Sequence, residues 1–108
     1  MNTREEAQRI AARARIQLEK IYGPRLRGVY LFGSCARGEG GEDSDIDIAV
    51  VLDDVPDTLA EIERTGDLFS TLSLDAGSVV SRLFVGEVDF HTGRYALYRD
   101  IRREGVAV

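Results

Sequence analysis

The chain has 108 residues, of which 44% are hydrophobic and 31% are charged, and its formal net charge at pH 7 is −5. This length and composition predict one globular domain, spanning residues 1–108, with its own hydrophobic core. The acidic balance argues against general DNA or RNA binding, because neutralising phosphates requires a basic surface.

A helix and a strand are predicted at the start of the chain. Alanine, leucine and isoleucine recur at helical spacing over residues 3–21, which predicts an amphipathic helix. Thr3 and Glu6 resemble a capping box that would begin this helix, and a glycine–proline pair would end it. Residues 27–32 are rich in β-branched and aromatic types and therefore predict a buried strand.

A glycine-rich segment links this strand to the clearest strand in the chain. Gly33 ends the first strand, and Ser34 is expected to cap a short helical turn over residues 35–37. Residues 45–52 alternate between polar and apolar types at their start and are fully apolar at their end. This pattern predicts a strand with one solvated end and one buried end.

Three further elements are predicted in the second half of the chain. Residues 57–73 read as a long helix, residues 78–85 as a third strand and residues 94–103 as a short final helix. His91 is expected on a turn at the surface. The apolar side of the long helix comprises Leu59, Ile62, Leu68, Phe69 and Leu72. The final helix is expected to have a packing role, with partner binding as the alternative for its arginines, Arg99, Arg102 and Arg103.

This order of elements predicts an α+β (α/β) fold in which helices flank a small mixed β-sheet. The link between the first two strands is about a dozen residues, near the lower limit for a parallel crossover, so an antiparallel pair is favoured. The single cysteine, Cys35, excludes an internal disulfide, and with one histidine it argues against a Cys/His zinc site. No apolar run approaches the roughly 20 residues that span a bilayer. We therefore expect a cytoplasmic protein without a membrane segment.

Two carboxylates stand at the solvated start of the second strand. Asp45 and Asp47 are two positions apart, and such side chains point to the same face of a strand. Neighbouring carboxylates repel unless a cation lies between them, and Mg²⁺ prefers oxygen ligands. An acidic loop that runs into a strand would give the same pair without any metal, so the pair alone does not identify a site.

Gly33 and Ser34 form a second half-site at the end of the first strand. A glycine there lets the backbone approach a ligand closely, and the N–H groups at the start of a helical turn attract anions. The alternative is an ordinary N-cap serine after a turn glycine. The two half-sites together favour a functional site over the alternatives, because magnesium and triphosphate bind as one complex that needs both a phosphate-binding turn and carboxylates.

At these residues the chain resembles a known family. Gly33-Ser34, ten intervening residues and Asp45-Ile46-Asp47 resemble the signature of the DNA-polymerase-β-like nucleotidyltransferase superfamily. The fuller form Gly-Ser-x-Ala-Arg-Gly, followed by Ser-Asp-x-Asp, is most similar to the minimal nucleotidyltransferases found in HEPN/MNT toxin–antitoxin pairs. The resemblance implies the nucleotidyltransferase fold.

The resemblance also implies roles for individual residues. Gly33 and Ser34 would hold the β- and γ-phosphates of ATP or another NTP, and Asp45 and Asp47 would be the catalytic carboxylates that bind Mg²⁺. Arg37 would support the loop or reach the phosphates. The alternative for Arg37 is a salt bridge to a nearby acid, Glu39, Glu42 or Asp43.

One expected feature is missing. The family usually has a third acid on a neighbouring strand, which binds metal and acts as the base toward the attacking hydroxyl. The best candidate strand, residues 78–85, contains neither Asp nor Glu, and Ser81 and Arg82 lie where the acid is expected. The flanking acids are Asp75, Glu87 and Asp89. A slow enzyme, an enzyme completed by its partner and a nucleotide-binding domain without catalysis all remain open.

By resemblance, the function would be transfer of NMP, most simply AMP from ATP, to a tyrosine of a HEPN-type partner toxin, so that the chain acts as an antitoxin. A catalytically weak or inactive antitoxin that works by contact is the first alternative. A small-molecule nucleotidyltransferase is the second, and it would need an additional domain or a dimer to form the acceptor pocket. The sequence leaves a homo-oligomer open.

Overall fold

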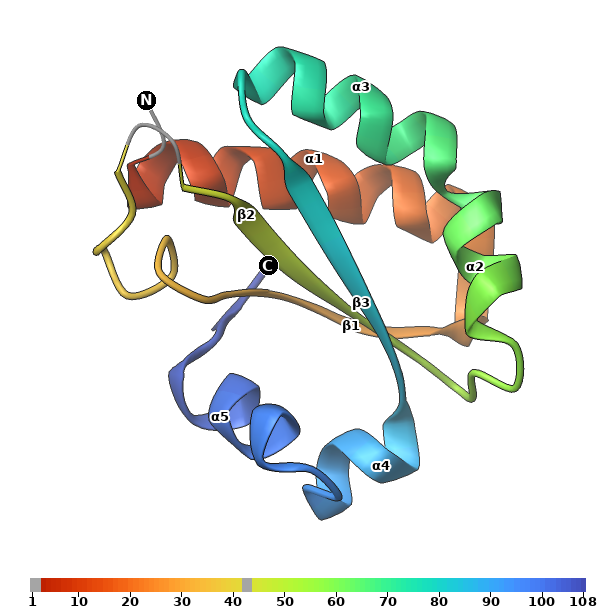
Figure 1. Ribbon diagram of the computed structural model, residues 1–108. Helices are drawn as coiled ribbons and strands as arrows, with labels where there is room; N and C mark the ends of the chain where they lie inside the picture. The colour runs from red at the N-terminus through yellow and green to blue at the C-terminus, as the bar shows by residue number, and fades with distance from the viewer. Residues whose placement is uncertain (1–2, 42–43) are drawn as a thin grey trace.

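The computed structural model describes residues 3–41 and 44–108. Its elements follow one another in this order (Figure 1): α1 (Arg4–Tyr22), a 3-10 turn η1 (Gly23–Arg25), β1 (Leu26–Phe32), β2 (Ile46–Leu52), α2 (Thr58–Arg64), α3 (Gly66–Ala76), β3 (Val80–Gly86), α4 (Glu87–Thr92), α5 (Ala96–Glu104) and β4 (Val106–Ala107). Within these residues, no helix combines the length and apolar character needed to cross a bilayer.

The four strands form one mixed sheet in the order β3-β2-β1-β4. β1 pairs with β2 in the antiparallel sense, as the short link between them predicts, and β2 pairs with β3 in the parallel sense. The mixed sheet flanked by helices confirms the predicted fold class.

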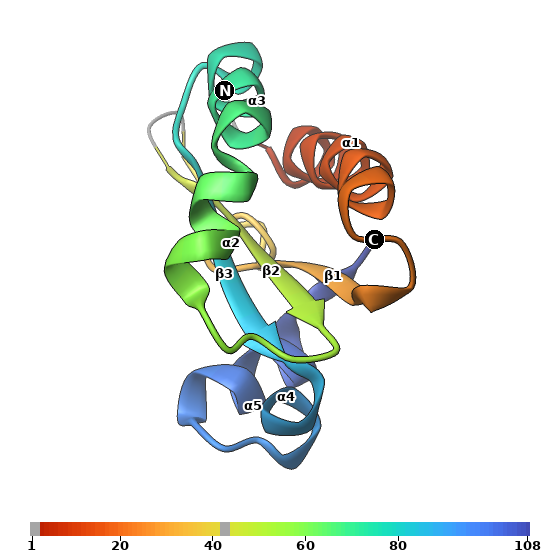
Figure 2. The ribbon, with the colours of Figure 1, turned by 90° about the vertical axis from the view of Figure 1, so that its right-hand side faces the viewer.

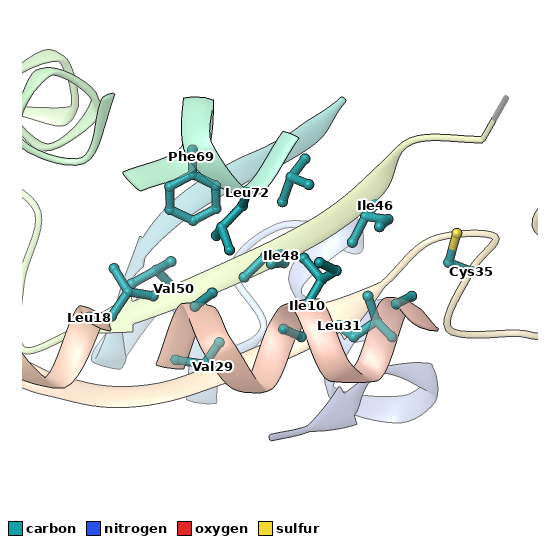
Figure 3. Packing of buried hydrophobic residues seen from close by; sticks show 14 of the residues in the cluster. Ile10, Leu18, Val29, Leu31, Cys35, Ile46, Ile48, Val50, Phe69 and Leu72 are labelled. Carbon is teal, nitrogen blue, oxygen red and sulfur yellow. The ribbon is translucent and has the colours of Figure 1, made fainter. Parts of the chain in front are cut away.

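Each face of the sheet is covered by its own pair of helices, as Figure 2 shows. Along β2, Ile46, Ile48 and Val50 share one buried cluster with residues of α1 and α3 (Figure 3). Ala49 and Val51 belong to a second cluster, with residues of α4 and α5. Because successive side chains of a strand alternate, Asp47 lies on the α4/α5 face of the sheet.

Helix α1 begins and ends where the sequence predicts. The Glu6 backbone N–H donates a 3.1 Å hydrogen bond to the Thr3 hydroxyl oxygen, so the predicted cap is present. Gly23, at φ +57°, follows the last residue of the helix. The apolar side of α1 is buried at Ala7, Ala11, Ala14 and Leu18, each fully excluded from solvent.

The predicted single helix over residues 57–73 is wrong, because two helices, α2 and α3, meet at Thr65. The Thr65 hydroxyl donates to the Glu61 carbonyl oxygen at 2.9 Å, and the Arg82 guanidinium donates to the Ile62 carbonyl oxygen at 2.7 Å. These bonds satisfy carbonyls at the end of α2, so the helix can stop there. The break also exposes Ile62 and most of Leu59, which the helical pattern had assigned to the apolar side.

Two short elements escape the sequence pattern. Helix α4 has six residues, of which only Phe90 is buried, too few to show a helical period. His91 is exposed as predicted, but it lies on this helix and not on a turn. Strand β4 has two residues and is defined by its pairing with Tyr30 and Leu31 of β1.

Candidate nucleotide and metal site

The segment after β1 is a hydrogen-bonded turn. The Arg37 N–H donates to the Gly33 carbonyl oxygen at 3.3 Å, and the Glu39 N–H donates to the Ser34 carbonyl oxygen at 2.9 Å. The turn covers residues 34–38 and is not part of a helix, so the short turn predicted over residues 35–37 is present, one residue longer at each end. The Ser34 hydroxyl has no hydrogen-bonding partner among the residues that the structure describes, and it is free to donate to a ligand.

Gly33 joins the two half-sites that the sequence predicts. Phe32, the last residue of β1, pairs with Asp47 of β2, so the chain turns at Gly33 directly beside this carboxylate. A Cβ atom at Gly33 would collide with Oδ2 of Asp47. Gly33 also has a φ of +78°, a left-handed backbone conformation that is unfavourable for every residue with a Cβ atom. Glycine is therefore required at this position both for space and for backbone conformation.

Asp45 and Asp47 flank Ile46, which is fully buried against the α1/α3 face. Asp47 therefore lies on the opposite face of the sheet, and strand alternation predicts the same face for Asp45, which directly precedes β2. Asp47 is half-buried in β2, and Asp45 is exposed just before the strand. The structure thus buries Ile46 between two more accessible acids, and the shared face of the two carboxylates stays a prediction.

Cys35 ties the turn to the segment that carries the carboxylates, a contact that sequence reasoning missed. Its thiol is buried and donates a 3.4 Å hydrogen bond to the Asp45 carbonyl oxygen. Burial raises the pKa of this thiol, and the carboxylates of Asp47 and Asp45 raise it further. The thiol is therefore protonated at neutral pH and has a structural role.

Ser81 occupies the place expected for the third acid. In the parallel register of β2 and β3, Ser81 is the direct partner of Asp47. Its hydroxyl donates a 2.6 Å hydrogen bond to Oδ1 of Asp47. The neighbouring Arg82 points to the other face, where its Nε donates to the Thr65 hydroxyl oxygen at 2.9 Å.

None of the flanking acids replaces the missing carboxylate. Asp75 forms a 2.7 Å salt bridge with Arg13 of α1. Glu87 and Asp89 follow Gly86, the last residue of β3, which lies roughly 16 Å along the strand from Ser81 at about 3.3 Å per residue. Consistently, the described part of the chain contains no group of three or more His, Cys, Asp or Glu side chains that could hold a metal ion.

Arg37 is held by two acids at the edge of the turn. Its Nε lies 3.2 Å from Oε2 of Glu39, which is the salt bridge that the sequence offered as the alternative role. Its second partner, Glu104 of α5 at 3.9 Å, is far away in the sequence and was not predicted. The other two acids proposed for this bridge, Glu42 and Asp43, lie outside the described residues. All three paired side chains are more than 40% exposed, so these bridges are weak enough to be exchanged for a phosphate.

A cavity of about 200 Å³ adjoins the turn. Phe32, Gly33 and Arg37 form its wall on the sheet side, and Leu97 and Glu104 of α5 form the wall opposite. The turn thus borders a partly open pocket between β1 and α5, and the residues that line it include Gly33 and Arg37 but not Asp45 or Asp47.

The donor atoms at this site fit a magnesium–nucleotide complex. Mg²⁺ is commonly held by one or two carboxylates together with substrate phosphates, and Asp45 and Asp47 offer two carboxylates on one face. The contact between Gly33 and Asp47 brings the turn that would cradle phosphate directly beside them. Two carboxylates without a third acid provide few ligands, so metal and nucleotide would have to bind together.

Comparisons with known proteins identify the family. A family model described as a nucleotidyltransferase domain matches residues 11–103. Among curated proteins, the chain is 40% identical over 74 residues to a protein adenylyltransferase, MntA, of Thermococcus cleftensis, covering 68% of this chain and 73% of the relative.

Two solved structures share the fold. One is a toxin–antitoxin crystal structure with AMP-PNP, which matches at a TM-score of 0.62 and 28% identity over 88% of this chain and 69% of the other. The second is a complex of a tri-AMPylated Shewanella oneidensis HEPN toxin with an MNT antitoxin, at a TM-score of 0.57 and 25% identity, covering 94% and 70%.

Proposed function

Because the chain belongs to the nucleotidyltransferase domain family, we propose that it transfers AMP from magnesium-bound ATP to a tyrosine of a HEPN-type toxin and so acts as an antitoxin. The observation that carries this proposal is the contact between Gly33 and Asp47, which unites a phosphate-binding turn with a carboxylate pair. Relatives named as protein adenylyltransferases support AMP as the group transferred, and a solved complex with an AMPylated HEPN toxin supports a HEPN protein as the acceptor.

In this proposal each residue has one task. Backbone at Gly33 and the Ser34 hydroxyl hold the β- and γ-phosphates, and Arg37 moves from its two acids to the triphosphate. Asp45 and Asp47 would hold Mg²⁺, which would neutralise charge at the α-phosphate. The acceptor hydroxyl loses its proton to water and its oxygen bonds to the α-phosphorus, while the bond from the α-phosphorus to the oxygen that bridges to the β-phosphate breaks and pyrophosphate leaves.

The chemistry of the site favours a phenol as the acceptor. An aliphatic alcohol needs a positioned general base to take its proton as it attacks, and in the described part of the chain no third carboxylate lies beside Asp47 for that task. A tyrosine hydroxyl, with a pKa of about 10, loses its proton to water far more readily. A chain with Ser81 in place of the acid is therefore better suited to a tyrosine than to a serine or threonine.

Ser81 also favours a second candidate function, in which the domain binds nucleotide and neutralises its partner by contact without catalysis. The two candidates predict different behaviour of the Asp45→Asn/Asp47→Asn double variant. The enzyme loses protection against the toxin in cells, whereas the contact antitoxin keeps it.

The direct test is intact-mass measurement of the purified HEPN partner after incubation with the chain and Mg-ATP. We expect the toxin to gain the mass of one or more AMP groups. The Asp45→Asn/Asp47→Asn variant should give no gain, and Asp67→Asn, an exposed acid on α3, should behave as wild type. An unmodified toxin that is nevertheless silenced by the wild-type chain would reject the enzymatic proposal and favour the contact antitoxin.

A further inference from the structure

The carboxylate of Asp47 is fixed from both sides by the chain itself. Its Oδ1 accepts a 2.6 Å hydrogen bond from the Ser81 hydroxyl, within the short range of bonds to charged oxygens. Its Oδ2 faces the α-carbon of Gly33 so closely that no side chain fits between them. A carboxylate held in this way cannot rotate freely about its last bond.

The position of Ser81 is set by the sheet and not by a flexible loop. Its neighbours along β3 are locked on the opposite face, since Val80 is buried in the α1/α3 core and Arg82 is bonded to Thr65. The parallel register then places Ser81 directly beside Asp47. Such a rigid strand-borne donor is suited to orienting a ligand carboxylate.

Resting on the magnesium–ATP site proposed above, we propose that Ser81 is a positioning residue, which orients Asp47 so that a free oxygen lone pair faces the metal. A carboxylate accepts at about four lone-pair sites, so the bond to Ser81 leaves the others for a cation. Ser81 also leaves the centre with two carboxylates instead of three. The metal therefore binds appreciably only when the phosphates of the nucleotide complete its ligands.

A matched pair of substitutions separates the hydroxyl from the shape of the side chain. Threonine keeps the hydroxyl and valine replaces it with a methyl group of similar size, and both β-branched residues suit a strand. ATP binding is measured by calorimetry with Mg²⁺ and, separately, with EDTA. Ser70→Ala on the exposed side of α3 is the control.

We expect Ser81→Thr to bind Mg-ATP as wild type does and Ser81→Val to bind about tenfold more weakly. With EDTA, the residual affinity for ATP should be the same in all variants, because Ser81 acts through the metal ligand. Equal binding of Mg-ATP by the valine and threonine variants would overturn the proposal. If Ser81→Val loses ATP affinity equally with Mg²⁺ and with EDTA, the proposal is also overturned, since the substitution would then disturb the structure and not the metal ligand.

A second variant tests the two-carboxylate centre without nucleotide. Ser81→Asp places a third carboxylate beside Asp47, and like charges destabilise each other unless a cation binds. Mn²⁺ alone, followed by its electron paramagnetic resonance signal and by the melting temperature, should bind this variant more tightly than wild type and stabilise it more. An unchanged Mn²⁺ affinity would overturn the placement of Ser81 at the metal. If wild type shows no magnesium-dependent ATP binding at all, the proposed site itself fails, and the Ser81 proposal with it.

Discussion

Replacing Gly33 with alanine should separate two effects that this glycine combines. The left-handed backbone at φ +78° costs a residue with a Cβ atom roughly 1–2 kcal/mol, and the added carbon also collides with Oδ2 of Asp47. Gly77, the left-handed cap of α3 at φ +70°, is a matched control, because a Cβ atom there meets nothing within 4 Å. The two variants share the backbone cost and differ in the collision.

The magnitudes follow from the two costs. Gly77→Ala should lower the free energy of unfolding by about 1–2 kcal/mol, a fall in melting temperature of roughly 4–16 °C, and leave Mg-ATP affinity unchanged. Gly33→Ala should show a similar or larger loss of stability and at least tenfold weaker binding of Mg-ATP, about 1.4 kcal/mol, because the added carbon displaces the Asp47 carboxylate that is proposed to hold the metal. Thermal melts and calorimetry measure both. If the two variants bind Mg-ATP equally well, Gly33 does not position Asp47 and the coupling of the half-sites is refuted.

Other predictions follow from contacts around the site and the core. Tyr22→Phe removes the 2.7 Å hydrogen bond from the tyrosine hydroxyl to the buried Glu61, so urea unfolding should show a loss of about 1–2 kcal/mol with unchanged ATP binding. Burial and Glu61 raise the pKa of Tyr22 in the folded chain, so its contribution is present below about pH 10 and is lost as the pH rises further; stability of the phenylalanine variant should fall less above pH 10. Glu104→Gln should remove one of the two acids that hold Arg37 and strengthen ATP binding up to about fivefold, whereas weaker binding would mean that Glu104 helps to place Arg37. The rate of AMP transfer should rise about tenfold per pH unit between pH 7 and 9, as the acceptor phenol ionises; a flat profile would indicate a base supplied from elsewhere.

The sheet and the two half-sites are predictable from the sequence because they rest on local patterns. Alternation of side chains is enough to place Asp45 and Asp47 on one face, and the short link is enough to favour an antiparallel hairpin. These features require no knowledge of distant contacts. The sequence places either Ser81 or Arg82 where the third acid is expected, and only the parallel register of the structure assigns that place to Ser81.

The features that were missed depend on residues far apart in the chain. The break at Thr65 is satisfied partly by Arg82 of β3, which no helical period can indicate. The bridge from Arg37 to Glu104 exists only because α5 returns beneath the end of β1. Likewise, nothing in the local sequence indicates that the Cys35 thiol bonds to the Asp45 carbonyl oxygen and so links the turn to the segment with the carboxylates.

The most direct test of the central claim is calorimetric titration of ATP into the chain, with and without Mg²⁺, for wild type and for Asp45→Asn/Asp47→Asn. Gly33, Ser34, Asp45 and Asp47 are claimed to form one magnesium–nucleotide site. Wild type should bind ATP strongly only with Mg²⁺, and the double variant should lose this dependence while its melting temperature stays close to that of wild type. Equal ATP affinity of both proteins, or an ATP affinity of wild type that is the same with and without Mg²⁺, would contradict the claim.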